Sequence, residues 1–119
     1  MTVLMCKSAF FSRELADLAG EKEIICFHDA EDTSETYTPE DWLSECLSRH
    51  NVTVVMYESR FFVDPAPFRR GSPNTRFVII SGPGDETNTE QAFVCGACAA
   101  IEKPITAQDV QGVMSFVSR

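Results

Sequence analysis

The chain has 119 residues, enough for one compact domain with a single core and too few for two domains of ordinary size. Apolar residues make up 44% of the sequence and charged residues 24%, a composition typical of soluble globular proteins rather than disordered or membrane-embedded ones. Because 18 acidic side chains oppose 10 basic ones, the net charge is -8, which disfavours direct binding of nucleic acids or anionic lipid surfaces.

The cellular compartment follows from two further features. No apolar stretch reaches the length of a membrane-spanning helix, and the N-terminus lacks a basic region followed by a long hydrophobic run. The cysteines are odd in number and lie mostly inside apolar runs, where buried thiols are common: Cys6, Cys26, Cys46, Cys95 and Cys98. We expect a single domain over residues 1–119 that is cytoplasmic, has no disulfide framework and needs no metal or cofactor.

Short apolar runs predict buried strands along the whole chain. They are continuous rather than alternating, as in parallel strands that are covered on both faces of a sheet. The runs are Val3–Cys6, Ile24–Phe27, Val52–Tyr57, Phe77–Ile80 and Cys98–Ile101.

Helical patterns separate the first three runs. Apolar residues recur at helical spacing over residues 11–18, and Gly20 supplies a stop. A second helix is expected to begin at Thr38, whose side chain can cap it, with Pro39 in the first turn. Trp42 then lies on the apolar face of this helix, so we interpret it as a core residue rather than a stacking platform for bases.

The second half of the chain contains one irregular segment and two further helices. Residues 60–75 are rich in proline and glycine and predict a loop with at most a short helix. Thr89 is expected to cap a helix that ends at Gly96. Thr106 and Asp109 resemble a capping box at the start of the last helix, whose apolar residues follow at spacings of three and four.

Strands that alternate with helices predict a parallel sheet with right-handed crossovers. The expected fold class is α/β, a flavodoxin-like doubly wound sheet of five strands in the order 2-1-3-4-5, with a short or irregular third helix. Ligands of such sheets bind at the carboxyl ends of the strands, so chemistry is expected there. The polar stretch Asp29–Thr36 is interpreted as a solvated loop.

The second half of the chain contains three motifs in order: the run Phe77–Gly82, the pair Gly96-Ala97 and the run Ile101–Pro104. This order of motifs resembles the receiver domains of bacterial two-component response regulators. In that family a hydroxyl residue closes the fourth strand, and a Lys-Pro pair follows the fifth strand. Ser81 and Lys103 match these positions, 22 residues apart (103 minus 81).

The resemblance implies a phosphorylation site that this chain has lost. Receivers hold Mg²⁺ with two acids after the first strand, and an aspartate after the third strand accepts the phosphoryl group. Here the acid pair falls on Lys7 and Ser8, and the acceptor falls on Tyr57, or on Met56 if the register slips by one. An ammonium about 4 Å from a divalent cation costs about 8 kcal/mol at an effective dielectric near 20, so metal binding is expected to be abolished.

Two features of the degenerate site leave alternatives open. Glu58, the one acid near the end of the third strand, either pairs with Lys103 and imitates the charged state or points to solvent. The family's switch uses an aromatic residue on the fifth strand, and that position falls on Ala100 here. We therefore expect a pseudo-receiver, a non-enzymatic signalling module that works without phosphorylation.

The resemblance also implies how such a module acts. Receivers commonly dimerise or bind partners through the fourth helix, fifth strand and fifth helix, a face that includes Phe93, Val94, Ala100 and Gln111 here. A helix cannot turn adjacent Phe93 and Val94 into one narrow apolar stripe, so at least one is expected to be exposed. A second candidate contact is the segment around Phe62. We expect a protein partner or an output domain, transcriptional or enzymatic, and a homodimer is one form of this contact.

An enzymatic alternative rests on Cys6. A cysteine after the first strand invites comparison with small phosphatases and phosphotransfer B subunits, whose thiolate sits in a loop of backbone amides. Six residues separate Cys6 from Arg13, and the segment contains no glycine, so the anion cradle has poor support.

Two other motifs could be interpreted as a metal or redox site and as a phosphate-binding loop, but we favour structural roles for both. Cys95 and Cys98 have the spacing of a redox or metal-ligand pair, but the candidate histidines, His28 and His50, are distant in sequence, so core packing fits better. The segment Ser81–Asp85 is rich in glycine, but it lacks the lysine and hydroxyl residue of a phosphate-binding loop and is interpreted as a turn.

Overall fold

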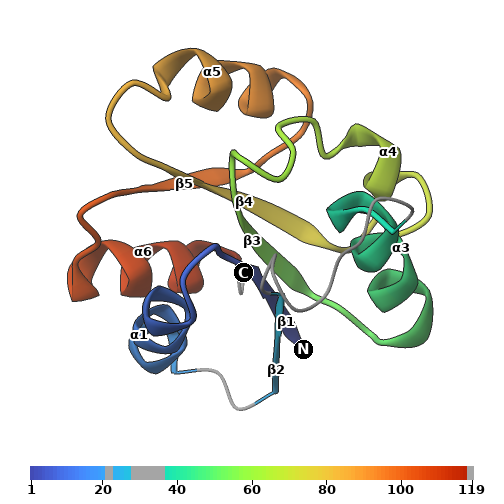
Figure 1. Cartoon of the computed structure of the whole chain (residues 1–119), viewed down its shortest axis with the longest axis horizontal. Coiled ribbons are helices and arrows are strands. Elements are labelled where there is room, and N and C mark those ends of the chain that lie inside the picture. Colours follow the sequence, from blue (N-terminus) through green and yellow to red (C-terminus); the bar gives the residue numbers. More distant parts are fainter. Residues whose placement is uncertain (21–22, 28–36, 118–119) are drawn as a thin grey trace.

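The computed structural model describes residues 1–20, 23–27 and 37–117, so the segment Asp29–Thr36 and His28 lie outside the described residues. A five-stranded parallel sheet with the order β2-β1-β3-β4-β5 forms the centre of the molecule (Figure 1). The strands are β1 (Thr2–Met5), β2 (Ile24–Phe27), β3 (Val54–Glu58), β4 (Arg76–Ser81) and β5 (Ala99–Glu102). The fold class predicted from the sequence is confirmed.

Helices cover both faces of the sheet (Figure 1). Helices α1 (Ala9–Ala19) and α6 (Ala107–Val117) pack on one face and contact each other. The opposite face carries α3 (Pro39–Arg49), the single turn α4 (Ala66–Arg69) and α5 (Glu86–Val94). The short α4 confirms the prediction of an irregular third crossover.

Most helix ends follow the signals in the sequence. Helix α1 ends at Gly20, which has a φ of 71° and therefore a left-handed conformation that favours glycine. Thr38 and Asp41 form a reciprocal capping box at the start of α3. At the start of α6, the backbone N–H of Asp109 donates to the Thr106 hydroxyl over 3.1 Å.

Helix α5 departs from the prediction at its N-terminus. It begins at Glu86, with Asp85 as the N-cap, so the prediction that Thr89 caps the helix is wrong. The Thr89 hydroxyl instead donates to the backbone carbonyl of Asp85, one turn back. Ala92 is the only buried residue of α5, so this helix covers the sheet with little apolar area.

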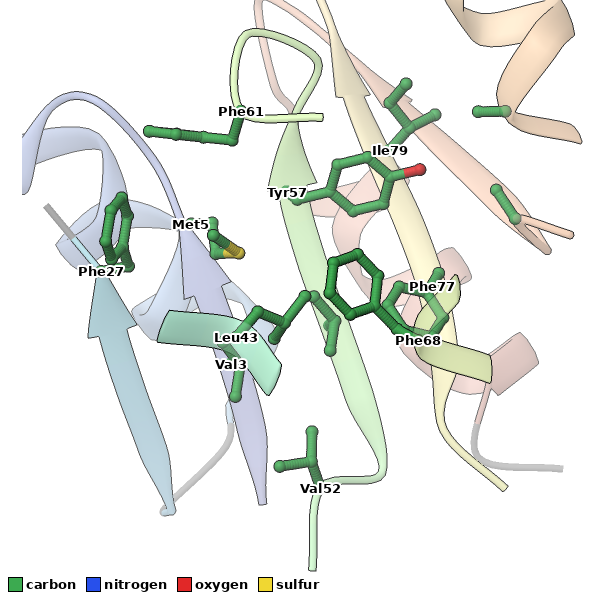
Figure 2. Close-up of a cluster of buried hydrophobic side chains, with 13 residues drawn as sticks. Val3, Met5, Phe27, Leu43, Val52, Tyr57, Phe61, Phe68, Phe77 and Ile79 are labelled. Carbon is green, nitrogen blue, oxygen red and sulfur yellow. The ribbon is translucent and has the colours of Figure 1, made fainter. Parts of the chain in front are cut away.

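Side chains of β3 alternate between two hydrophobic clusters, one on each face of the sheet. Val55 and Tyr57 point toward α3, α4 and α5, where Tyr57 lies beside Phe77 in the cluster drawn in Figure 2. Val54 and Met56 pack on the other face, with α1 and α6. The same alternation directs the last residue of β3, Glu58, toward the α1 and α6 side. Within the described ranges, no helix is long and apolar enough to cross a membrane.

Candidate functional site at the carboxyl edge of the sheet

The polar residues singled out in the sequence converge where the strands end. Glu58 is the last residue of β3 and Ser81 the last residue of β4, and Lys103 directly follows β5. Parallel register aligns these ends, since Glu58 pairs with Ile80 and Ser81 pairs with Glu102. The backbone N–H of Lys103 donates to the Ser81 carbonyl over 2.8 Å, which ties the two loops together.

Glu58 has both carboxylate oxygens engaged. Its Oε2 lies 2.5 Å from the Lys103 Nζ, and its Oε1 accepts a hydrogen bond from the backbone N–H of Lys7 over 2.5 Å. Only 9% of Glu58 is exposed, so these contacts replace most of its hydration. Of the two interpretations of Glu58, the structure supports the ion pair, and a solvent-facing orientation is wrong.

Lys103 is held from a second side by an aromatic ring. Its Nζ lies 4.6 Å from the centroid of the Phe11 ring, which belongs to α1, a distance at which a cation is attracted to the ring face. The Lys103 side chain is 37% exposed, and its peptide bond to Pro104 is cis. The ammonium group is therefore partly desolvated and positioned by both β3 and α1.

Lys7, Ser8 and Tyr57, which occupy the positions expected for the receiver acids and acceptor, have different structural roles here. Lys7 has an exposed side chain and contributes its backbone N–H to Glu58. The Ser8 hydroxyl caps α1 by accepting from the N–H of Phe11. Tyr57 points to the opposite face of the sheet, where its hydroxyl donates to the Val63 carbonyl over 3.1 Å and burial raises its pKa. The structure thus places Glu58, rather than Tyr57, opposite Lys103.

Met56, the alternative acceptor position, is also absent from this group. It is fully buried in the cluster formed with α1 and α6. Met56 lies two residues before Glu58 in β3, so both side chains point to the same face of the sheet. Glu58 therefore lies at the edge of the sheet, next to that cluster.

Asp85 is a site residue that the sequence interpretation missed. Its Oδ2 accepts hydrogen bonds from the Gly82 N–H over 2.8 Å and from the Ser59 hydroxyl over 3.2 Å. These bonds join the loop after β3 to the loop after β4. An aspartate three residues after Gly82 in a Gly-Pro-Gly turn was the available signal, since such side chains bond to nearby backbone.

Two open cavities flank the ion pair. One of about 310 Å³ is lined by residues that include Glu58, Arg60, Asp85 and Lys103. The other, of about 380 Å³, runs between α5 and the end of β5, and its wall contains Lys103 and three acidic residues, Glu86, Glu90 and Glu102. In the part of the chain that is described, no three His, Cys, Asp or Glu residues come together to hold a metal ion.

The geometry of Cys6 argues against a nucleophilic role. Its side chain is fully buried, and burial raises its pKa to about 12, with a further rise from the nearby Glu58 carboxylate. Nucleophilic cysteines need the opposite shift, because the thiolate is the reactive form. Cys95 and Cys98 are both free thiols and half-buried, and burial also raises the pKa of Cys98.

The expected interaction face is only partly exposed. Both Phe93 and Val94 are accessible, with exposures of 45% and 87%, and Gln111 is exposed on α6. Ala100 is half-buried and packs against the cluster beneath α5. Phe62 stacks on Tyr57 with ring centroids 4.1 Å apart, so it covers the core on that side.

The fold matches that of solved receiver structures. Full-length FixJ from B. japonicum superposes with a TM-score of 0.78, 15% identity and 99% of this chain covered. The receiver domain of NtrX from Brucella abortus gives a TM-score of 0.74, 15% identity and coverage of 98% of this chain and 97% of that domain. The chain has the receiver fold. A response-regulator receiver protein from Clostridium thermocellum, at 16% identity and a TM-score of 0.76, covers 98% of this chain and 91% of its own.

The receiver fold accounts for only part of some of these proteins. The chain spans 57% of full-length FixJ and 26% of a longer NtrX structure. No protein-family model matches the sequence, and no curated protein does. The likeness therefore lies in the three-dimensional arrangement of the chain.

Proposed function

We propose that this chain is a phosphorylation-independent pseudo-receiver, a non-enzymatic signalling domain that acts through protein contacts. The observation that carries the proposal is the internal ion pair at the sheet edge. Glu58 lies within 2.5 Å of the Lys103 ammonium and is largely buried, so a negative charge already faces the lysine without a phosphoryl group.

The same arrangement disfavours phosphoryl transfer. Phosphoryl transfer of the receiver kind needs an acceptor carboxylate that is free to attack and a divalent cation to neutralise the developing charge. In this chain both oxygens of Glu58 are occupied, and the residues after β1 are Lys7 and Ser8 instead of acids. A metal ion would have to displace Lys103 and would meet one carboxylate where receivers offer several.

Contacts with a protein partner or an output domain are the remaining way for such a domain to signal. Exposed apolar side chains on α5, Phe93 and Val94, support this proposal because they stand on a helix with little buried area of its own. Longer proteins such as FixJ and NtrX, of which this chain spans only a part, support an output domain, transcriptional or enzymatic, as the element regulated.

The test is exposure of the purified protein to millimolar Mg²⁺ and acetyl phosphate, followed by intact-mass spectrometry. Wild type is expected to show no added phosphoryl group and no saturable Mg²⁺ response in its tryptophan fluorescence. The matched control is the triple variant Lys7→Asp, Ser8→Asp, Glu58→Asp, which restores the acids to this scaffold and is expected to gain one phosphoryl group. A hydroxylamine-labile phosphoryl group on wild type would refute the proposal.

A further inference from the structure

A third cavity, lined by polar groups, lies at the amino edge of the sheet, on the side opposite to Glu58 and Lys103. It has a volume of about 270 Å³ and is formed by the loop before β4 and the turn after α5. Its wall contains two arginines and no carboxylate: the lining residues are Arg69, Pro73, Asn74, Thr75, Arg76, Gly96 and Cys98. The cavity wall is therefore positively charged, although the net charge of the whole chain is -8.

Arg69 is positioned over this cavity by the shape of the turn at Gly96. A Cβ on Gly96 would lie 2.3 Å from Arg69 Nη1 and 3.0 Å from its Cδ, so any side chain there would displace the arginine. Gly96 also has a φ of 116°, which other residues rarely adopt. The glycine therefore allows both the turn and the close approach of the guanidinium.

The cavity's donors are free to bind a ligand. In the described part of the chain, no hydrogen bond or ion pair engages the side chains of Arg69, Arg76 or Asn74. The neighbouring polar groups already have hydrogen-bond partners within the protein. The buried Thr75 hydroxyl donates to the Val52 carbonyl over 2.8 Å, and the Cys98 N–H donates to the Phe77 carbonyl over 2.9 Å. The two positive charges also act on the Cys98 thiol, where burial raises the pKa and both arginines oppose that rise.

We propose that the cavity lined by Arg69, Arg76 and Asn74 binds a phosphoryl group, as free phosphate or as a small phosphate ester. Guanidinium groups bind oxyanions through paired hydrogen bonds, and two of them from different elements suit a tetrahedral dianion better than a planar, singly charged carboxylate. A cavity of about 270 Å³ is smaller than most sites that enclose drug-sized ligands, so it suits the phosphoryl group with at most a small substituent.

The test is a titration of ¹⁵N-labelled protein with inorganic phosphate, phenyl phosphate or acetate, at neutral pH and constant ionic strength set with chloride. Amide shifts of Asn74, Gly96 and Cys98 are expected to saturate with either phosphate but not with acetate. A tighter response to phenyl phosphate identifies an esterified ligand, and a tighter response to phosphate identifies the free anion. Equal binding of acetate, or no saturation with either phosphate, would overturn the proposal.

Single charge-removing variants locate the binding energy. Arg69→Gln and Arg76→Gln are each expected to weaken phosphate binding about tenfold, which corresponds to about 1.4 kcal/mol. Arg70→Gln is the matched control because it removes the same charge from an adjacent, exposed residue outside the cavity wall. An equal loss in all three variants would show diffuse attraction and overturn the site. Because the cavity lies at the opposite edge, none of these outcomes depends on the phosphorylation test.

Discussion

Lys103→Met tests whether the ion pair with Glu58 stabilises the domain. Methionine keeps most of the aliphatic stem that lies against Phe11 but removes the ammonium group. The variant leaves the Glu58 carboxylate with the Lys7 N–H as its one remaining partner among the contacts described. Since Glu58 is only 9% exposed, water can replace the lost partner only in part.

The expected loss of unfolding free energy is about 2 kcal/mol. Removing one partner of a fully buried pair costs about 3–5 kcal/mol, whereas exposed pairs contribute at most about 1 kcal/mol. This pair lies between those limits, because the Glu58 side chain is 11% exposed and the Lys103 side chain 37% exposed. For a chain of this length, such a loss lowers the Tm by about 8 °C.

The assay is thermal and urea unfolding of four proteins: wild type, Lys103→Met, Glu58→Gln and the double variant. A coupling energy above about 1 kcal/mol from this cycle is the expected result. Arg49→Met provides the matched control, because Arg49 and Glu45 form an ion pair of similar length, 2.6 Å, with side chains 69% and 41% exposed. If Lys103→Met costs no more than Arg49→Met, the inference of a stabilising buried pair is refuted.

Three further outcomes follow from the structure. Burial raises the pKa of Cys6 from 9.0 to about 12, so its stabilising contribution is complete below about pH 9 and declines toward pH 12. Urea titrations should show a smaller decline in Cys6→Ala than in wild type, because the buried groups Tyr57 and Cys98, whose pKa values are also raised, remain in the variant. Tyr57→Phe should cost about 1 kcal/mol in the same titrations by leaving the Val63 carbonyl without its donor. Val94→Asp should lower self-association, measured by solution mass, or partner binding, measured by pull-down, and should leave the Tm unchanged. A lower Tm in the variant would contradict this prediction.

The topology could be predicted because its signals are local and repeated. Each buried run is flanked by turns or helix caps, as with Gly20 after α1 and the Thr38 capping box before α3. Continuous apolar runs exclude a sheet with one solvated face, and alternation with helices leaves parallel pairing as the simplest arrangement. Strand ends shifted by up to two residues, because apolar character does not mark where pairing begins. Val52, for example, is buried yet precedes β3.

The start of helix α5 is harder to predict from the sequence because the apolar pattern of this helix is weak. One buried residue, Ala92, gives the helix almost no amphipathic signal, so the sequence pattern does not distinguish Thr89 from Asp85 as the residue that caps it. The helix begins after Asp85, whose carboxylate accepts hydrogen bonds from the Gly82 N–H and from the Ser59 hydroxyl of a neighbouring loop. A contact across 26 residues has no local signature in a single sequence.

The assignment of the site depended on one position in β3, and strand geometry explains the outcome. Successive side chains of a strand face opposite sides, so Tyr57 and Glu58 cannot both approach Lys103. Tyr57 supplies a large ring to the cluster under α4, where it stacks on Phe62, and this packing fixes which face each residue takes. Glu58 is thereby directed to the α1 side, where the Lys7 N–H and Lys103 meet it. The aromatic core thus determines that the acid, and not the tyrosine, faces the lysine.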